Sequence, residues 1–248
     1  MEGAMVETLR PAKVTDQLVE HLARSIVSGR IRPSERVPSE AELVSRFGIS
    51  KVGVREAIGV LAALGLVQVQ QGKRTLVRDE QDWHILSKVV QQALREELGS
   101  AHVLGQLFEV RLILEPAVAA LAAERVTGDG AKELEGLVAD LQRIASGTQD
   151  TREFLQKDLS FHDGVVRLVQ NPSMRAMVAD LYRHMLDNWD DSRVTATDLA
   201  DLVDEHAAIA DAIARKDPEA ARAAMDRHIV RAREVEIGRR SKRPETRA

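Results

Sequence analysis

Residues 39–57 read Ser-Glu-Ala-Glu-Leu-Val-Ser-Arg-Phe-Gly-Ile-Ser-Lys-Val-Gly-Val-Arg-Glu-Ala, and this stretch decides the fold of the first third of the chain. Ser39 precedes Glu42 by three positions, which is the spacing of a capping box and predicts the start of a helix. Gly48 is a typical residue for the end of that helix. Ser50 is placed to cap a second helix. Two short helices with so short a turn between them predict a helix-turn-helix.

The flanking residues extend this motif on both sides. Residues 66–70 alternate apolar and polar side chains, residues 71–73 have the composition of a turn, and residues 74–77 return as a second short strand. This pattern predicts a β-hairpin in the position of a wing. Upstream, an amphipathic helix is indicated by apolar residues at i+4 spacing, namely Val14, Leu18, Leu22 and Ile26.

From Trp83 onward the apolar periodicity is helical, and no strand pattern returns. Glycine, serine and proline residues separate the helical segments, and Pro172 and Pro218 suit the first position of a helix. The predicted fold class is therefore mainly α, with a winged helix-turn-helix followed by an all-α antiparallel helical bundle. The expected helices are 83–98, 102–126, 129–146, 150–170, 172–190, 198–215 and 218–237.

These patterns divide the chain into four parts. We expect a DNA-binding domain over residues 8–78, a linker with a connecting helix over residues 79–100, a helical domain over residues 101–238, and a basic, disordered tail over residues 239–248.

Composition and charge restrict the function. The chain of 248 residues has no cysteine, which excludes disulfides and thiolate zinc sites and favours a reducing compartment. It shows neither a secretory signal nor an apolar run long enough for a membrane span, so we expect a cytoplasmic protein without a membrane partner. Residues 8–78 hold 12 Lys and Arg against 6 Asp and Glu, whereas residues 79–238 hold 18 against 30. A basic first third on an acidic body indicates a polyanionic partner for the first third only.

Two sets of residues carry a family resemblance. The runs at 37–43, 47–51 and 54–57 resemble the DNA-binding domain of GntR-type regulators, and the likeness continues through the wing. The remainder looks like the FadR-type (FCD) ligand-sensing domain of that family, on the run 109–116 and on Asp158, His162, Asn171, Pro172, Glu205, His206 and His228. Ala41, where the family usually has arginine, together with Trp83, is similar to sugar-acid-responsive members.

The resemblance implies a recognition helix that enters the major groove of double-stranded DNA. Lys51 and Arg55 are four residues apart and share a face, and the guanidinium of Arg55 suits a guanine edge. The alternative for this pair is a solvated helix face. A glycine at position 53 permits close approach to DNA. We expect DNA contacts from Ser50, Lys51, Gly53, Arg55, Gln71, Gly72 and Lys73. Because one winged helix offers little contact area, a homodimer on an inverted repeat is expected.

Asp158 and His162 lie at i and i+4 on a predicted helix and so project from one face. Such a pair alone is usually a surface pair. With His206 and His228 on two later helices, the resemblance implies that all four bind one divalent ion per subunit, of the Zn, Ni or Mn type. The other histidines, at positions 21, 84, 102 and 184, are expected to be ordinary surface or packing residues.

Two further residues are candidates for binding the effector. Arg111 is a single cation in an apolar stretch and either clamps a carboxylate or forms a structural salt bridge. Asn188, beside Trp189, is expected to line the pocket. The predicted function is a transcriptional regulator, favoured as a repressor, controlled by a small organic or sugar acid at the metal site. The alternatives are a metal-dependent enzyme, since an Asp/His site can activate water, and a constitutive DNA-binding protein with a structural metal.

Overall fold

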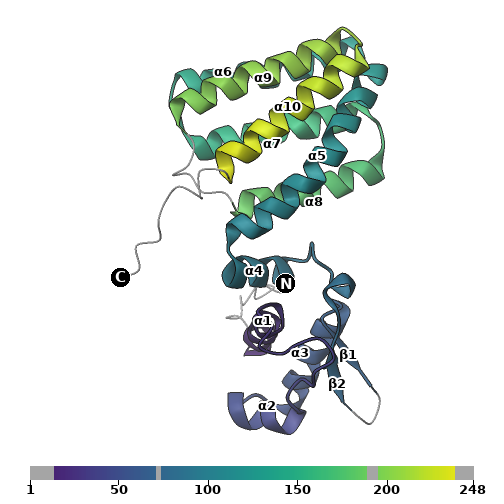
Figure 1. Ribbon diagram of the computed structural model, residues 1–248, viewed down its shortest axis with the longest axis vertical. Coiled ribbons are helices and arrows are strands. Elements are labelled where there is room, and N and C mark those ends of the chain that lie inside the picture. Colours follow the sequence, from purple (N-terminus) through teal and green to yellow (C-terminus); the bar gives the residue numbers. More distant parts are fainter. Residues whose placement is uncertain (1–13, 71–73, 189–194, 238–248) are drawn as a thin grey trace, which may run out of the picture. The chain divides into compact units, whose positions relative to one another are not determined.

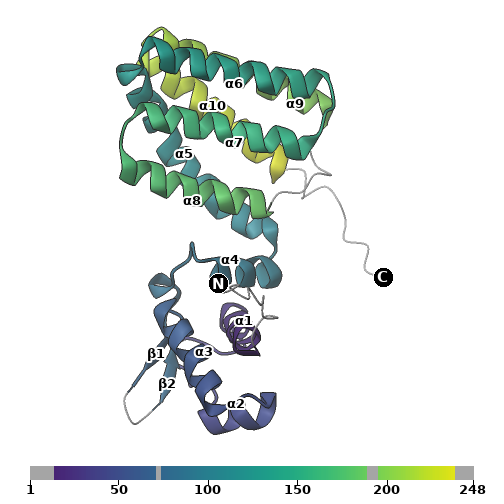
Figure 2. The same ribbon diagram turned by 180° about the vertical axis from the view of Figure 1, so that it is seen from behind.

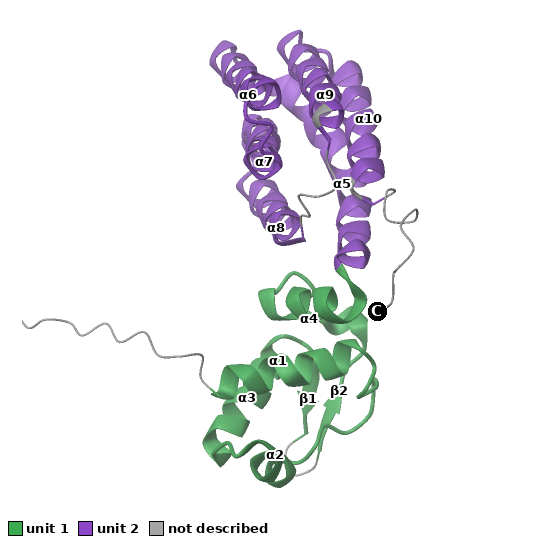
Figure 3. Cartoon of the chain, turned by 90° about the vertical axis from the view of Figure 1, so that its left-hand side faces the viewer, with its two compact units in different colours: residues 1–99 green, residues 100–248 purple. Residues whose placement is uncertain are grey.

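The structure is a computed structural model that describes residues 14–70, 74–188 and 195–237. The chain forms two compact units, residues 1–99 and residues 100–248 (Figure 3). The first unit therefore includes the segment that the sequence assigned to a linker. Each unit is described separately below.

The first unit contains the predicted helix-turn-helix (Figure 1). Helix α1 spans Val14–Val27, α2 spans Glu40–Phe47 and α3 spans Lys51–Ala63. The capping box between Ser39 and Glu42 is present, and Gly48 ends α2 in the left-handed conformation. The side chain of Ser50 accepts a hydrogen bond from the backbone of Gly53 and caps α3. The predicted capping signals of both helices are thus confirmed.

The wing is a two-stranded antiparallel sheet of β1, Val67–Val69, and β2, Thr75–Val77. The register pairs Val67 with Val77 and Val69 with Thr75. A third segment adds to the edge of β2, where Arg36 forms an isolated antiparallel bridge with Leu76. The predicted turn at residues 71–73 lies outside the described residues.

The predicted helix over residues 83–98 is wrong in its first part. Residues Glu80–Asp82 form a short 3-10 helix, and α4 begins only at Lys88, capped by Ser87, and ends at Leu98. Other hydrogen bonds hold the intervening segment: the backbone N–H of His84 donates to the carbonyl of Leu64 at 2.9 Å, and the indole of Trp83 donates to the carbonyl of Arg78 at 3.2 Å. Gly65, which follows α3 with φ of 73°, is required here, because a Cβ would lie 2.1 Å from the carbonyl oxygen of Asp82.

The second unit is the predicted helical bundle. Its described residues form six helices, α5 (Ser100–Arg125), α6 (Gly128–Ser146), α7 (Thr151–Leu168), α8 (Pro172–Asn188), α9 (Ala196–Ala214) and α10 (Pro218–Glu236). Pro172 and Pro218 open their helices as predicted. Helix α9 begins two residues before the predicted start, because Thr195 and Asp198 form a capping box.

The six helices form two layers (Figure 2). In one layer α7 lies between α6 and α8, and in the other α10 lies between α5 and α9. Large apolar side chains such as Phe108 of α5 and Phe161 of α7 are fully buried between them. None of the helices in the described part of the chain has the length and apolar character that a membrane span requires.

Candidate functional site

The first candidate site is the exposed face of α3. Lys51 and Arg55 are both exposed, as a groove-reading helix requires. The Nε of Arg55 donates to both carboxylate oxygens of Glu40, at 3.0 and 3.1 Å. This pair is open to water and contributes little to stability, but it holds the guanidinium of Arg55 beside the start of α2. The exposed placement fits a DNA contact and equally fits a solvated face.

Gly53 requires a correction. It is buried, not open to an approaching DNA backbone, and a Cβ on it would lie 2.9 Å from Cγ2 of Ile49 and 3.2 Å from Oγ1 of Thr15. The glycine is therefore explained by close packing within the unit. Ser50 is accounted for as the cap of α3. The predicted wing contacts Gln71, Gly72 and Lys73 lie outside the described residues.

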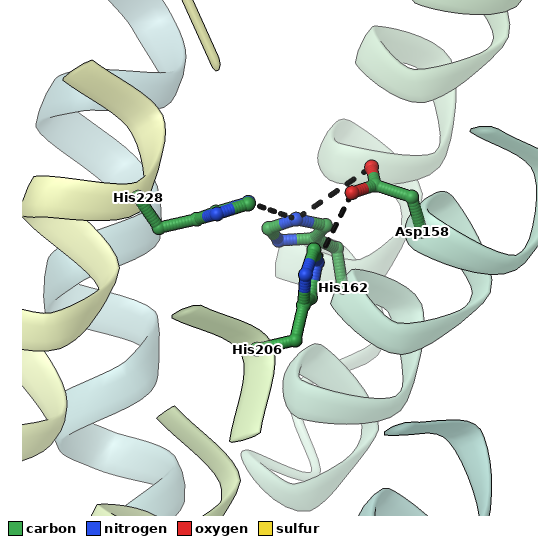
Figure 4. Close-up of side chains that lie close together, drawn as sticks. All are labelled: Asp158, His162, His206 and His228. Carbon is green, nitrogen blue, oxygen red and sulfur yellow. Dashed lines mark hydrogen bonds and ion pairs between the residues drawn. The ribbon is translucent and has the colours of Figure 1, made fainter. Parts of the chain in front are cut away.

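The second candidate site is a cluster of four buried side chains in the bundle (Figure 4). Asp158 and His162 project from α7, His206 from α9 and His228 from α10, so the two helical layers meet here. One potential ligand atom from each residue lies within 4.8 Å of the others. The structure thus brings together all four residues that the sequence predicted.

The far side of each imidazole ring contacts a hydrogen-bond acceptor. Nδ1 of His206 lies 2.7 Å from the carbonyl oxygen of Leu202. Nδ1 of His162 lies 2.6 Å from Oε2 of Glu115. Nδ1 of His228 lies 3.0 Å from Oε2 of Glu205. The carbonyl of Leu202 and the ionised carboxylate of Glu115 only accept, so they favour a proton on Nδ1 of His206 and of His162 and leave the lone pair of Nε2 in these two rings directed at the centre of the cluster.

The contacts at the centre have the character of a cation site. Nε2 of His206 lies 3.0 Å from Oδ1 of Asp158, yet it is buried and makes no hydrogen bond of good geometry. Nε2 of His162 lies 3.2 Å from Nε2 of His228. Atoms with converging lone pairs at these distances need a proton or a metal ion between them. Three imidazoles and one carboxylate suit a borderline divalent ion, so the residues present fit the predicted group.

The electrostatics favour the ligand forms of two of these residues. Burial opposes ionisation of Asp158, but the close approach of His206 and the charges of His162 and His228 hold its pKa below the usual range. Burial, together with His206 and His162, lowers the pKa of His228 well below its usual value, so this ring is neutral at pH 7. Outside the cluster, burial raises the pKa of Glu205 to about 7, against the opposing charge of Arg231.

Arg111 lies beside this cluster and forms the structural salt bridge that was one of the two alternatives predicted for it. Its Nε donates to Oε1 of Glu115 at 2.5 Å, and its Nη2 lies 3.3 Å from Nε2 of His162. Arg111 and Glu115 are both buried. Burial raises the pKa of Glu115, but the charges of Arg111 and His162 outweigh it and hold that pKa at about 2. The salt bridge is therefore present, and the guanidinium also reaches the edge of the cluster.

Two residues around this site were not predicted to act there, and one predicted residue is not linked to it. Glu115 and Glu205 support the histidines, and their only signal in the sequence was their place among the residues that carry the family resemblance. Asn188 is buried at the end of α8, where its amide donates to the carbonyl of His184 at 2.8 Å. No described contact joins Asn188 to the four-residue cluster. Trp189 lies outside the described residues.

A winged helix-turn-helix and a helical domain with a buried polar centre together define a class of protein, the DNA-binding regulators with a sensor domain. Comparison with known families assigns both parts: residues 14–77 match the gntR family of bacterial regulatory proteins, and residues 106–231 match the FCD domain. The chain belongs to the GntR family and is a transcriptional regulator. This assignment excludes the alternative in which the Asp/His cluster is the active site of a metal-dependent enzyme.

Relatives agree with this assignment. The chain is 30% identical to the galactonate operon transcriptional repressor of Escherichia coli, over 84% of this chain and 90% of that protein. It is 30% identical to the transcriptional repressor NanR of Cronobacter sakazakii, over 88% and 83%. Among solved structures, the Listeria monocytogenes regulator described as Lar is 18% identical with a TM-score of 0.57, covering 91% of this chain and 97% of that one, and it supports the fold alone.

Proposed function

We propose that this chain is a ligand-controlled transcriptional repressor. A homodimer binds a double-stranded operator with inverted-repeat symmetry, and a small carboxylic or sugar acid bound at a divalent metal ion in the FCD domain changes the affinity for DNA. Repression is supported by the names of the relatives. A bacterial regulator that binds chromosomal DNA works in the cytoplasm, which is the location we propose.

DNA reading is assigned to the exposed face of α3. Lys51 and Arg55 lie four residues apart on that face, and Ser50 at its start is free on one side to donate its hydroxyl to a phosphate. Arg55 is assigned to a guanine edge, because only its Nε is used by Glu40 and its terminal nitrogens offer a bidentate fork. Gln71, Gly72 and Lys73 of the wing remain proposed contacts to flanking DNA.

The single observation that carries the sensor proposal is the convergence of three Nε2 atoms and one carboxylate in a buried centre. We propose that Asp158, His162, His206 and His228 hold one divalent ion of the Zn, Ni or Mn type. When bound, such an ion supplies open coordination positions for the oxygens of an acid. Glu115 and Glu205 contact the Nδ1 atoms of His162 and His228 and orient these rings, and loss of a residue that orients a metal ligand typically lowers metal affinity by about 10–100-fold.

The effector is proposed to be an acid for two reasons. Arg111 brings a buried guanidinium within 3.3 Å of a proposed metal ligand, where a carboxylate could meet both cations. The most informative relative is named for the galactonate operon, and galactonate is a sugar acid. Asn188 is proposed as a further residue of the effector pocket, on the strength of its buried amide oxygen without a hydrogen bond.

The test joins three measurements on the purified full chain. Metal analysis should find one divalent ion per chain. A thermal-shift screen should then find an acid, with galactonate and gluconate as first probes and galactose as the uncharged control, that raises the melting temperature. The same acid should change the affinity for the DNA upstream of the gene in a gel shift. A protein that contains the ion, but whose melting temperature and DNA affinity no acid changes, would instead be a constitutive DNA-binding protein with a structural ion.

A further inference from the structure

A groove of about 590 Å³ lies between the strands of the wing and α3. It is lined by Ile58 and Gly59 of α3 and by residues of the wing, among them Val69 and Thr75. Its lining also includes the side chains of three arginines, Arg36, Arg55 and Arg74. This groove is adjacent to the face of α3 proposed to read bases, and it has a different composition from that face.

The charges of the groove do not cancel. Glu40 also lines the groove, and it is already paired with Arg55. Arg36 and Arg74 are exposed, and among the described residues neither side chain takes part in an ion pair or hydrogen bond. Two guanidinium groups without an ion pair or hydrogen bond among the described residues therefore line the groove, and the charge of Arg36 acts at longer range on Glu42.

The backbone holds these two arginines on one face of the sheet. Arg36 lies directly opposite Leu76, and Arg74 lies two residues before Leu76, immediately before β2, so the three side chains start from one face of the sheet, opposite to the face of Thr75. Gln68 is also opposite Leu76, and the backbone N–H of Gln70 donates to the carbonyl of Arg74 at 3.1 Å. By the same alternation, the exposed polar residues of this face are Arg36, Gln68, Gln70 and Arg74, with hydrogen-bond donors on all four and no carboxylate.

We propose that Arg36 and Arg74 bind the phosphate backbone of the DNA next to the bases that α3 reads. The inference rests on the proposed DNA binding and adds two residues to it. Guanidinium groups bind phosphate oxygens bidentately, and amides such as those of Gln68 and Gln70 donate to the same oxygens. Contacts of this kind fix the position of the protein on the duplex without reading sequence, and they make affinity dependent on salt through the release of counterions.

The test measures the salt dependence of binding to a fluorescent duplex of mixed sequence, by anisotropy, with the full-length protein. Each phosphate contact contributes about 0.9 to the slope of log affinity against log salt. Arg36→Ala and Arg74→Ala should each reduce the slope by about 0.9. When salt rises from 50 to 200 mM, the fold-loss in affinity of each variant should therefore be about 3.5 times smaller than that of the parent chain. Arg32→Ala is the matched control, because Arg32 is exposed in the segment that precedes Arg36 but does not line the groove.

The outcomes separate this inference from the proposed function. A parent chain that binds no duplex at any salt concentration contradicts DNA binding itself. A parent chain that binds, with both variants keeping its slope or with Arg32→Ala reducing the slope equally, overturns the assignment of Arg36 and Arg74. If the variants lose affinity only for a duplex selected for tight binding, and not for the mixed duplex, the two arginines read bases. That result also overturns the assignment to phosphate contacts. Circular dichroism confirms that the variants are folded.

Discussion

Replacing Glu115 with glutamine removes the negative charge that faces both Arg111 and His162 while keeping the size of the side chain. Arg111 is then a buried cation without its ion-pair partner. Removing one partner of a buried pair typically costs about 3–5 kcal/mol. The pKa of Glu115 gives a consistent figure: its fall from 4.5 to about 2 corresponds to about 3 kcal/mol at 1.36 kcal/mol per unit.

The assay is thermal unfolding of the metal-free protein at pH 7. A loss of about 3 kcal/mol lowers the melting temperature of a domain of this size by roughly 6–12 °C. Because the pKa of Glu115 is depressed in the folded state, its stabilisation is complete above about pH 4.5 and disappears as the pH falls towards 2. The difference between the parent chain and Glu115→Gln should therefore narrow over that range.

Two comparisons make the result specific. Glu133→Gln breaks an exposed ion pair with Arg167 and should cost less than about 1 kcal/mol. The double variant Arg111→Leu with Glu115→Leu should recover part of the loss, because no unpaired charge stays buried. Equal melting temperatures for Glu115→Gln and Glu133→Gln would refute the view that Glu115 compensates a buried cation.

Three other predictions concern DNA reading, packing and assembly. Arg55→Ala should weaken binding to a selected operator by about 1–3 kcal/mol and relax its sequence preference in gel shifts at fixed salt, and an unchanged affinity would leave Arg55 on a solvated face. Gly53→Ala should destabilise the protein by about 1–3 kcal/mol in urea unfolding, because the new Cβ would contact Ile49. Gly59→Ala, which has open space at the position of its Cβ, should stabilise the protein by about 0.5–1 kcal/mol. Equal effects of the two substitutions would contradict the packing explanation. Light scattering should find a homodimer. Ile113→Glu should weaken the dimer, because Ile113 is an apolar residue of α5 that is 80% exposed. A monomer that saturates a single half-site would count against binding to an inverted repeat.

The sequence predicts the fold wherever local chemistry decides it. Ser39 with Glu42 and Ser50 start helices α2 and α3, and Pro218 opens α10, because caps and proline act within one turn of the chain. The predicted start of α4 was wrong, because the segment before it is held by a tertiary hydrogen bond from the backbone N–H of His84 to the carbonyl of Leu64, which periodicity does not reveal.

The candidate metal centre was predictable only in part. The i, i+4 spacing of Asp158 and His162 follows from the helix, but their approach to His206 and His228 depends on the packing of two layers and was expected from the family resemblance. The support of His162 by Glu115 joins α7 to α5 and was not predicted. For Gly53 the sequence suggested contact with DNA, whereas the close neighbour Ile49 becomes visible only in the folded unit.

The most direct test of the account is metal binding by the parent chain and by His206→Ala. Both proteins are stripped with a chelator and titrated with Zn²⁺, Ni²⁺ and Mn²⁺ by calorimetry, and the melting temperature is measured with and without the preferred ion. We expect one ion per parent chain and a rise in melting temperature, because an ion held by α7, α9 and α10 stabilises the folded domain by linkage. His206→Ala should bind the ion weakly, lose the rise in melting temperature and keep its basal DNA binding. A His206→Ala variant with full stoichiometry, unchanged affinity and the same rise in melting temperature would contradict the proposed centre.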